Sequence, residues 1–175
     1  MGKMNNFFGF HIYQSKDGSF INQAKYTRNL LERFGMTNNT KVKVPIVVGM
    51  RLSPSWDKPF VDLTTYRSMI GSLLYLTASR PDMTFDLYNC ARCQSNQRQP
   101  HLNAVKNIFQ YLKGIVSLRL WYPLKKGFFI QAFYDADMGR CQLDRKSTIG
   151  GCQLLDGKLV SWKSKKANLC FNFDC

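Results

Sequence analysis

Acidic residues are scarce in this chain, and glutamate is almost missing. Among 175 residues, 11 are Asp or Glu and 25 are Lys or Arg, which gives a formal net charge of +14 at pH 7. Glu32 is the only glutamate in the sequence. This balance disfavours enzymes whose sites need many carboxylates. Because an excess of cations attracts polyanions, nucleic acid is the leading expected partner; a basic surface that serves solubility or assembly is the alternative.

Histidine and the common catalytic motifs are scarce as well. His11 and His101 are the only histidines, and neither G-x-S-x-G nor G-x-x-x-x-G-K-[ST] occurs. No stretch approaches the roughly 18 consecutive apolar residues of a membrane helix, and residues 1–10 have no long apolar core of an export signal. We therefore expect an intracellular protein, in the cytoplasm or the nucleus, with no membrane partner.

The sequence has 6 cysteines, which we expect to be reduced thiols because no export signal precedes them. Cys90 and Cys93 form a C-x-x-C pair. That pair falls in a helical pattern, and no second pair of Cys or His completes the four ligands of a zinc site. A zinc site is therefore the less favoured interpretation.

The first part of the chain has the pattern of a hairpin followed by a helix. Two aromatic-rich runs, 7–13 and 19–21, flank an Asp-Gly turn signal at Asp17 and Gly18, which predicts a β-hairpin. Asn22 is the expected N-cap of a helix that ends before Gly35. Residues 36–61 contain prolines and show no sustained periodicity, so they are predicted to be an extended connector.

Three helices are expected between residues 62 and 114, and strands after them. Asp62 caps the first helix, Pro81 opens the second, and the third begins near Pro100 and ends at Gly114. Strands are predicted at 118–122, 128–134, 148–155 and 159–162, with a hairpin turn at 156–157 and no regular structure from 163 to 175. The predicted fold class is α+β, with an N-terminal hairpin (1–35), the connector (36–61), a helical unit (62–114) and a C-terminal antiparallel sheet (115–175).

Asp135 and Asp137 lie at the end of a predicted strand. Paired carboxylates in that position could hold a divalent cation for phosphoryl chemistry. The alternative is that both are turn residues whose side chains bond to their own backbone. The residues themselves leave both interpretations open.

Basic residues cluster in the C-terminal third of the chain. Such clusters neutralise phosphates without reading base sequence, although an ordinary solvated face is the alternative. The excess of cations over acids favours phosphate contacts. The candidate nucleic-acid-binding residues are Lys125, Lys126, Arg140, Arg145, Lys146, Lys163, Lys165 and Lys166.

Short motifs follow one another in a defined order along nearly the whole chain. They are FFGF (7–10), QAKY (23–26), LLERFGM (30–36), YRSMIGSLLYLT (66–77), ASRPD (78–82), HLNAVK (101–106), YLKG (111–114), DAD (135–137), DRKST (144–148) and VSW (160–162). In order and spacing, this series resembles the pol polyprotein of copia-type LTR retrotransposons.

The resemblance implies three structural parts. The opening hairpin is similar to the primer-grip region of the reverse transcriptase, the helices to its thumb and connection, and the strand-rich end to the start of a ribonuclease H domain. In the family, the fingers and palm with the Tyr-x-Asp-Asp metal site precede the primer grip, and they are absent from this sequence. Asp135 matches the first metal-binding aspartate of the ribonuclease H part, where the parent family uses Mg²⁺.

The sequence departs from the family pattern after Lys166. The next catalytic carboxylate of the family is a Glu that follows this segment, and no Glu occurs after Glu32. The resemblance therefore implies a truncated ribonuclease H part, an incomplete two-metal site with no functional metal ion, and a chain that is inactive alone. We expect it to bind RNA/DNA hybrid or duplex through phosphates. The alternatives are a subunit that completes a ribonuclease H site with another chain, such as the missing polymerase parts, and a self-associating interaction module.

Overall fold

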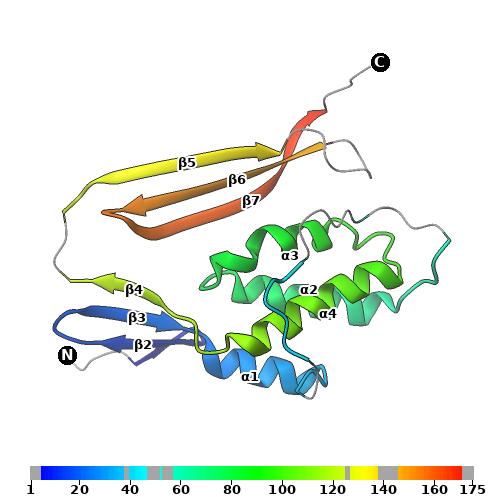
Figure 1. Ribbon diagram of the computed structural model, residues 1–175, viewed down its shortest axis with the longest axis horizontal. Helices are drawn as coiled ribbons and strands as arrows, with labels where there is room; N and C mark the ends of the chain where they lie inside the picture. Colours follow the sequence, from blue (N-terminus) through cyan, green and yellow to red (C-terminus); the bar gives the residue numbers. More distant parts are fainter. Residues whose placement is uncertain are drawn as a thin grey trace.

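The computed structural model of the protein describes residues 5–37, 40–46, 52, 57–124, 127–137 and 146–170. These residues form two antiparallel sheets and a group of helices (Figure 1), so the predicted α+β class is confirmed. None of the helices in the described ranges is long and apolar enough to cross a membrane.

The N-terminal sheet is built from strands that lie far apart in the sequence. Its order is β1 (Asn6–Phe7), β2 (Phe10–Gln14), β3 (Gly18–Asn22) and β4 (Leu120–Pro123). The predicted hairpin is confirmed as β2–β3, but the run 7–13 is not one strand. Phe8 and Gly9 have φ angles of 43° and 75°, and these left-handed residues turn β1 back onto β2. β4 pairs with β3, with Leu120 opposite Ile21, and so lies outside the C-terminal sheet to which the sequence pattern assigned it.

The helices begin close to the residues that the sequence indicated. They are α1 (Ala24–Arg33), α2 (Leu63–Leu76), the 3₁₀ turn η1 (Pro81–Met83), α3 (Thr84–Ala91) and α4 (Gln99–Gly114). The Asp62 cap is confirmed, because its Oδ2 accepts a hydrogen bond from the N–H of Thr65 at 2.6 Å. Asn22 lies one residue before the N-cap of α1, and its Oδ1 accepts the N–H of Ala24 at 3.1 Å.

One hydrophobic core joins these helices. Leu73 of α2, Leu87 of α3 and Phe109 of α4 are fully buried in it, and Leu30 of α1 packs against the same cluster. Burial of each such side chain contributes roughly 1.5–3 kcal/mol to folding. In the described part of the expected connector there is no helix, and Phe60 makes an isolated bridge to Arg98. The helices therefore supply most of the buried hydrophobic core of the described residues.

The C-terminal sheet has the order β5 (Ile130–Asp137), β6 (Lys146–Leu155) and β7 (Lys158–Cys170). The hairpin turn predicted at Asp156 and Gly157 is confirmed by their positive φ angles of 50° and 75°. The prediction of irregular structure from Lys163 onward was wrong, because β7 continues to Cys170. The polar sequence of this segment does not indicate a strand. Pairing with β6, for example of Lys165 with Ile149, stabilises the strand.

One face of this sheet lies against the helices and the other points outward. Thr148 and Ser164 are buried on the helix-facing side, and the Nη1 of Arg92 donates a hydrogen bond to Thr148 Oγ1 at 2.7 Å. Side chains alternate between the two faces of a strand, so Lys163 and Lys165 lie on the outer face with Ile149. Figure 1 shows β7 nearest the helices and β5 at the far edge of the sheet.

Candidate nucleic-acid interface

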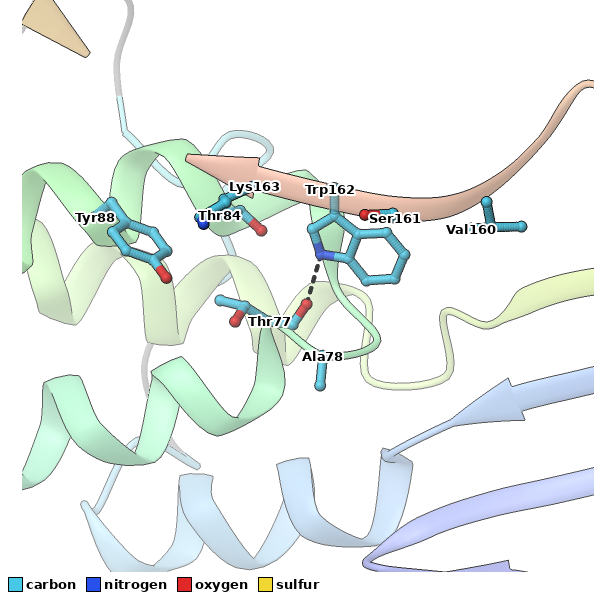
Figure 2. Close-up of a pocket in the computed structure, with 8 residues that line it drawn as sticks. All are labelled: Thr77, Ala78, Thr84, Tyr88, Val160, Ser161, Trp162 and Lys163. Carbon is cyan, nitrogen blue, oxygen red and sulfur yellow. Dashed lines mark hydrogen bonds between the residues drawn. The ribbon is translucent and has the colours of Figure 1, made fainter. Parts of the chain in front are cut away.

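The junction between β7 and the helices is held by Trp162. Its indole N–H donates a hydrogen bond of 2.7 Å to the backbone carbonyl of Thr77 (Figure 2). Thr77 is the C-cap of α2, and the last carbonyls of a helix have no partner within the helix. The indole therefore satisfies a helix end and at the same time fixes the position of β7.

A pocket of about 320 Å³ opens beside this hydrogen bond. Residues from the end of α2, the start of α3 and β7 line it, among them the aromatic residues Tyr88 and Trp162 (Figure 2). The lining residues are Thr77, Ala78, Thr84, Tyr88, Val160, Ser161, Trp162 and Lys163. This volume lies at the lower end of the range found for small-molecule sites.

Three of the predicted phosphate-binding lysines lie along β7. Lys163 and Lys165 are exposed on the outer face of the sheet, and Lys166 is exposed on the helix-facing side, opposite Thr148. Lys163 and Lys165 form no ion pair with the described residues, whereas Lys58 pairs with Asp57 and Arg80 with Asp82. The two cations on the outer face are thus available to a polyanion.

The other predicted cations lie partly outside the described ranges. Lys146 begins β6, but its side chain is not described. Lys125, Lys126, Arg140 and Arg145 lie outside the described residues altogether. For all of them the role in binding stays a prediction.

A second group of cations lies on α1 and α2, and the sequence interpretation missed it. Lys25, Arg28 and Arg33 of α1 and Arg67 of α2 are exposed. The Nη2 of Arg33 donates a hydrogen bond of 3.2 Å to the Oγ of Ser68, the residue that follows Arg67 in the chain. The spacing of Lys25 and Arg28 on a helix whose other face buries Thr27, Leu30 and Leu31 was the signal that could have identified this group.

Asp135 lies on β5 opposite Gly150, on the helix-facing side of the sheet, and it is exposed. Asp137 closes β5, and its side chain is not among those described. Within the described ranges, no three His, Cys, Asp or Glu side chains come together as a metal site would require. The described donors around Asp135 therefore do not fit a two-metal centre, which needs several carboxylates around both ions.

A partly buried ion pair holds η1 against α4. Arg80 is 3% exposed, and its Nε and Nη2 donate hydrogen bonds of 2.9 and 2.8 Å to the two carboxylate oxygens of Asp82. The hydroxyl of Tyr111 donates to Asp82 Oδ2 at 2.7 Å. Burial would raise the pKa of Asp82, but the hydrogen bonds and charge of Arg80 outweigh it and hold that pKa below its usual value. Burial and the neighbouring carboxylate raise the pKa of Tyr111 to about 12. This network is structural rather than reactive.

The residues of nucleophile and zinc-ligand type serve packing. Cys90 is fully buried, and burial raises the pKa of its thiol, so the thiolate is disfavoured. His101 is also fully buried, and its Nδ1 accepts the backbone N–H of Arg98 at 2.9 Å, which caps α4. Cys90 and Cys93 belong to no zinc-like cluster in the described part of the chain. Cys90 and His101 therefore serve the packing and capping of the helices.

Comparison with known proteins gives several relatives. An uncharacterised mitochondrial protein of Arabidopsis thaliana is 28% identical over 95% of this chain and 69% of its own length. The retrovirus-related Pol polyprotein from transposon RE1 of Arabidopsis thaliana is 31% identical over 94% of this chain, and the one from transposon TNT 1-94 of Nicotiana tabacum is 30% identical over 94%. The chain spans only 11% and 13% of these two polyproteins. No family model and no solved structure matches the chain.

Proposed function

We propose, on the premise that this chain belongs to the Pol polyprotein family of copia-type retrotransposons, that it binds RNA/DNA hybrid or duplex through the phosphates. It corresponds in this proposal to a reverse transcriptase and ribonuclease H segment. Binding is independent of base sequence, because lysine and arginine contacts to phosphates position a protein without reading the bases. Nucleic acid is thus the partner, and the chain is a binding segment rather than a complete catalyst.

The observation that carries this proposal is the arrangement of exposed cations. Lys163 and Lys165 project from the outer face of β7 without an ion pair. In an extended strand, alternate residues are spaced about 6.6 Å apart, which is close to the spacing of successive phosphates along a nucleic-acid strand. The net charge of +14 adds a long-range attraction for any polyanion.

Binding of the purified chain to a labelled RNA/DNA hybrid, measured over a salt series, tests the contact at β7. Replacing a lysine that neutralises one phosphate reduces the slope of log affinity against log salt by about 0.9. We therefore expect Lys165→Gln to flatten the slope by about that amount. Lys16→Gln is the matched control, because Lys16 is an exposed lysine in the turn between β2 and β3. Equal slopes for both variants would contradict a phosphate contact at β7.

The second part of the proposal is that the chain alone does not cleave hybrid. It is supported by the single exposed Asp135 on β5 and by the position of the only glutamate, Glu32, on α1. We expect no cleavage of a labelled hybrid at any added Mg²⁺ or Mn²⁺ concentration. Metal-dependent cleavage by the wild-type chain that Asp135→Asn abolishes would overturn this part. Because Asp135 is exposed, the variant should keep the stability of the wild type, which thermal unfolding can verify.

A further inference from the structure

The two edges of the C-terminal sheet differ in chemistry. Within the described residues β5 and β7 are its outer strands. Natural sheets protect free edges with lysine, proline or a bulge, because a bare edge pairs with other chains. β7 follows this rule with a bulge near Gln153 and Leu154 of its partner strand and with four lysines, Lys158, Lys163, Lys165 and Lys166. β5 does not, since residues 127–137 contain no lysine, arginine or proline.

The unprotected edge is also apolar and exposed. Phe133 is 53% exposed on the helix-facing side of β5, and Tyr134 is 71% exposed on the outer side. Phe128 and Ile130 at the start of the strand are exposed as well. Among the described residues α3 contacts β7, and Figure 1 shows β5 at the edge of the sheet away from the helices. Exposed apolar side chains on both faces of one edge strand favour association with another protein.

The hydrogen-bonding direction of β5 can be read from one contact. The N–H of Asp156 donates to the carbonyl of Phe129 at 2.7 Å, so Phe129 directs its carbonyl toward β6. In an antiparallel ladder this direction alternates from residue to residue. Ile130, Ala132, Tyr134 and Ala136 therefore direct their backbone N–H and C=O groups away from β6, toward the free edge. The edge is a ready template for another strand.

We propose that two copies of the chain associate by antiparallel pairing of their β5 strands, with Phe133 on the two-fold axis. In this register Ile130 pairs with the partner's Ala136, and Ala132 with the partner's Tyr134, so the outward backbone groups meet one another. Gln131 pairs with the partner's Asp135, whose carboxylate can accept a hydrogen bond from the amide. The two sheets join into one continuous sheet, and the helices of each copy lie toward its β7 ends.

The distribution of charge makes the β5 edge a better contact between two copies than the β7 edge. Two chains of net charge +14 repel each other, and β7 edges would bring lysines together. Residues 127–137 carry only Asp135 and Asp137 as charges. The register above places no two carboxylates directly opposite, which would be unfavourable. Pairing of β5 with the partner's β7 would instead leave both remaining edges free and lead to open-ended assemblies. Pairing of β5 with the partner's β5 uses the same edge of both copies, so the assembly ends at a dimer.

Sedimentation equilibrium in the absence of nucleic acid tests the association. We expect the wild type to reach a mass of twice 20.2 kDa and to dissociate on dilution. Phe133→Lys should remain at 20.2 kDa over the same concentrations, because two lysines would then face each other at the axis. The matched control is Phe85→Lys on α3, which changes a phenylalanine that is 46% exposed, and it should dimerise as the wild type does.

Circular dichroism of both variants separates loss of pairing from loss of folding, and a crosslink tests the register independently of both. In the proposed pairing Phe133 is a non-hydrogen-bonded pair with a Cα separation of about 4.5 Å, within the range of a disulfide. Phe133→Cys should therefore form a disulfide to its own copy under mild oxidation, identified by peptide mapping. Tyr134→Cys should not, because Tyr134 faces the partner's Ala132.

Three results would overturn the proposal. They are a wild type that stays at 20.2 kDa at every concentration, species larger than the dimer that grow without limit, and a crosslink at position 134 but not at 133. None of these measurements involves nucleic acid. Their outcome is therefore independent of the proposed binding function.

Discussion

The hydrogen bond between Trp162 and the end of α2 gives a sharp test of how the C-terminal sheet is attached. Trp162→Phe keeps an aromatic ring on β7 but removes the N–H that reaches the Thr77 carbonyl at 2.7 Å. A typical hydrogen bond contributes about 0.5–1.5 kcal/mol net, and a buried carbonyl left without its donor costs about 1–3 kcal/mol. Because Thr77 is only partly buried, we expect a loss of about 1–2 kcal/mol.

The assay is thermal unfolding followed by circular dichroism. For a chain of this length, about 1–2 kcal/mol corresponds to a fall in Tm of roughly 2–8 °C. Trp121→Phe is the matched control, because Trp121 on β4 stacks on Phe20 with ring centroids 4.2 Å apart and loses a similar part of its ring. We expect the control to lose about 1 kcal/mol less than Trp162→Phe, the net value of one hydrogen bond. If both variants lose the same free energy of unfolding, the hydrogen bond of Trp162 does not hold the C-terminal sheet to α2.

Four further substitutions test the electrostatics and the packing. Burial raises the pKa of Asp86 to about 6, so ionisation of this carboxyl at neutral pH opposes folding. Asp86→Asn should therefore stabilise the chain by about 1 kcal/mol at pH 7.5. Urea unfolding at a series of pH values should show that this gain disappears toward pH 4. Arg80→Lys keeps the positive charge but cannot make the bidentate contact with the Asp82 carboxylate. Urea unfolding should show that the free energy of unfolding falls by about 1–3 kcal/mol. A Cβ on Gly151 would lie 2.8 Å from the Tyr134 ring, whereas one on Gly150 would meet nothing within 4 Å. Gly150→Ala should therefore stabilise the strand by about 0.5–1 kcal/mol in thermal unfolding, and Gly151→Ala should not.

Much of the local structure could be predicted from the sequence, because it depends on local rules. The Asp62 cap and the Pro100 start and Gly114 end of α4 follow from which residues suit helix ends. The two features of the sheets that were predicted wrongly depend on pairing between distant strands. β7 continues through Lys163 and Lys165 because its partner strand supplies the hydrogen bonds, and no local pattern reports a partner. The membership of β4 in the N-terminal sheet depends likewise on pairing across about a hundred residues of sequence.

The candidate site could be predicted only in part, for the same reason. The sequence indicated the lysines of β7, but the pairing pattern was needed to show that Lys163 and Lys165 share the outer face. Lys25 and Arg28 lie on the exposed face of α1, and the apolar spacing of that helix reports only which face is buried. The isolation of Asp135 also depends on the tertiary structure, since ligands from other elements can complete a site that one motif begins.

Binding of the wild-type chain to two RNA/DNA hybrids of unrelated sequence, over one salt series, tests the central claim most directly. The account predicts equal affinities for the two hybrids and a linear fall of log affinity with log salt, with a slope of about −0.9 for each phosphate neutralised. No binding at low salt would contradict the account. A marked preference for one sequence would also contradict it, because phosphate contacts alone cannot distinguish bases.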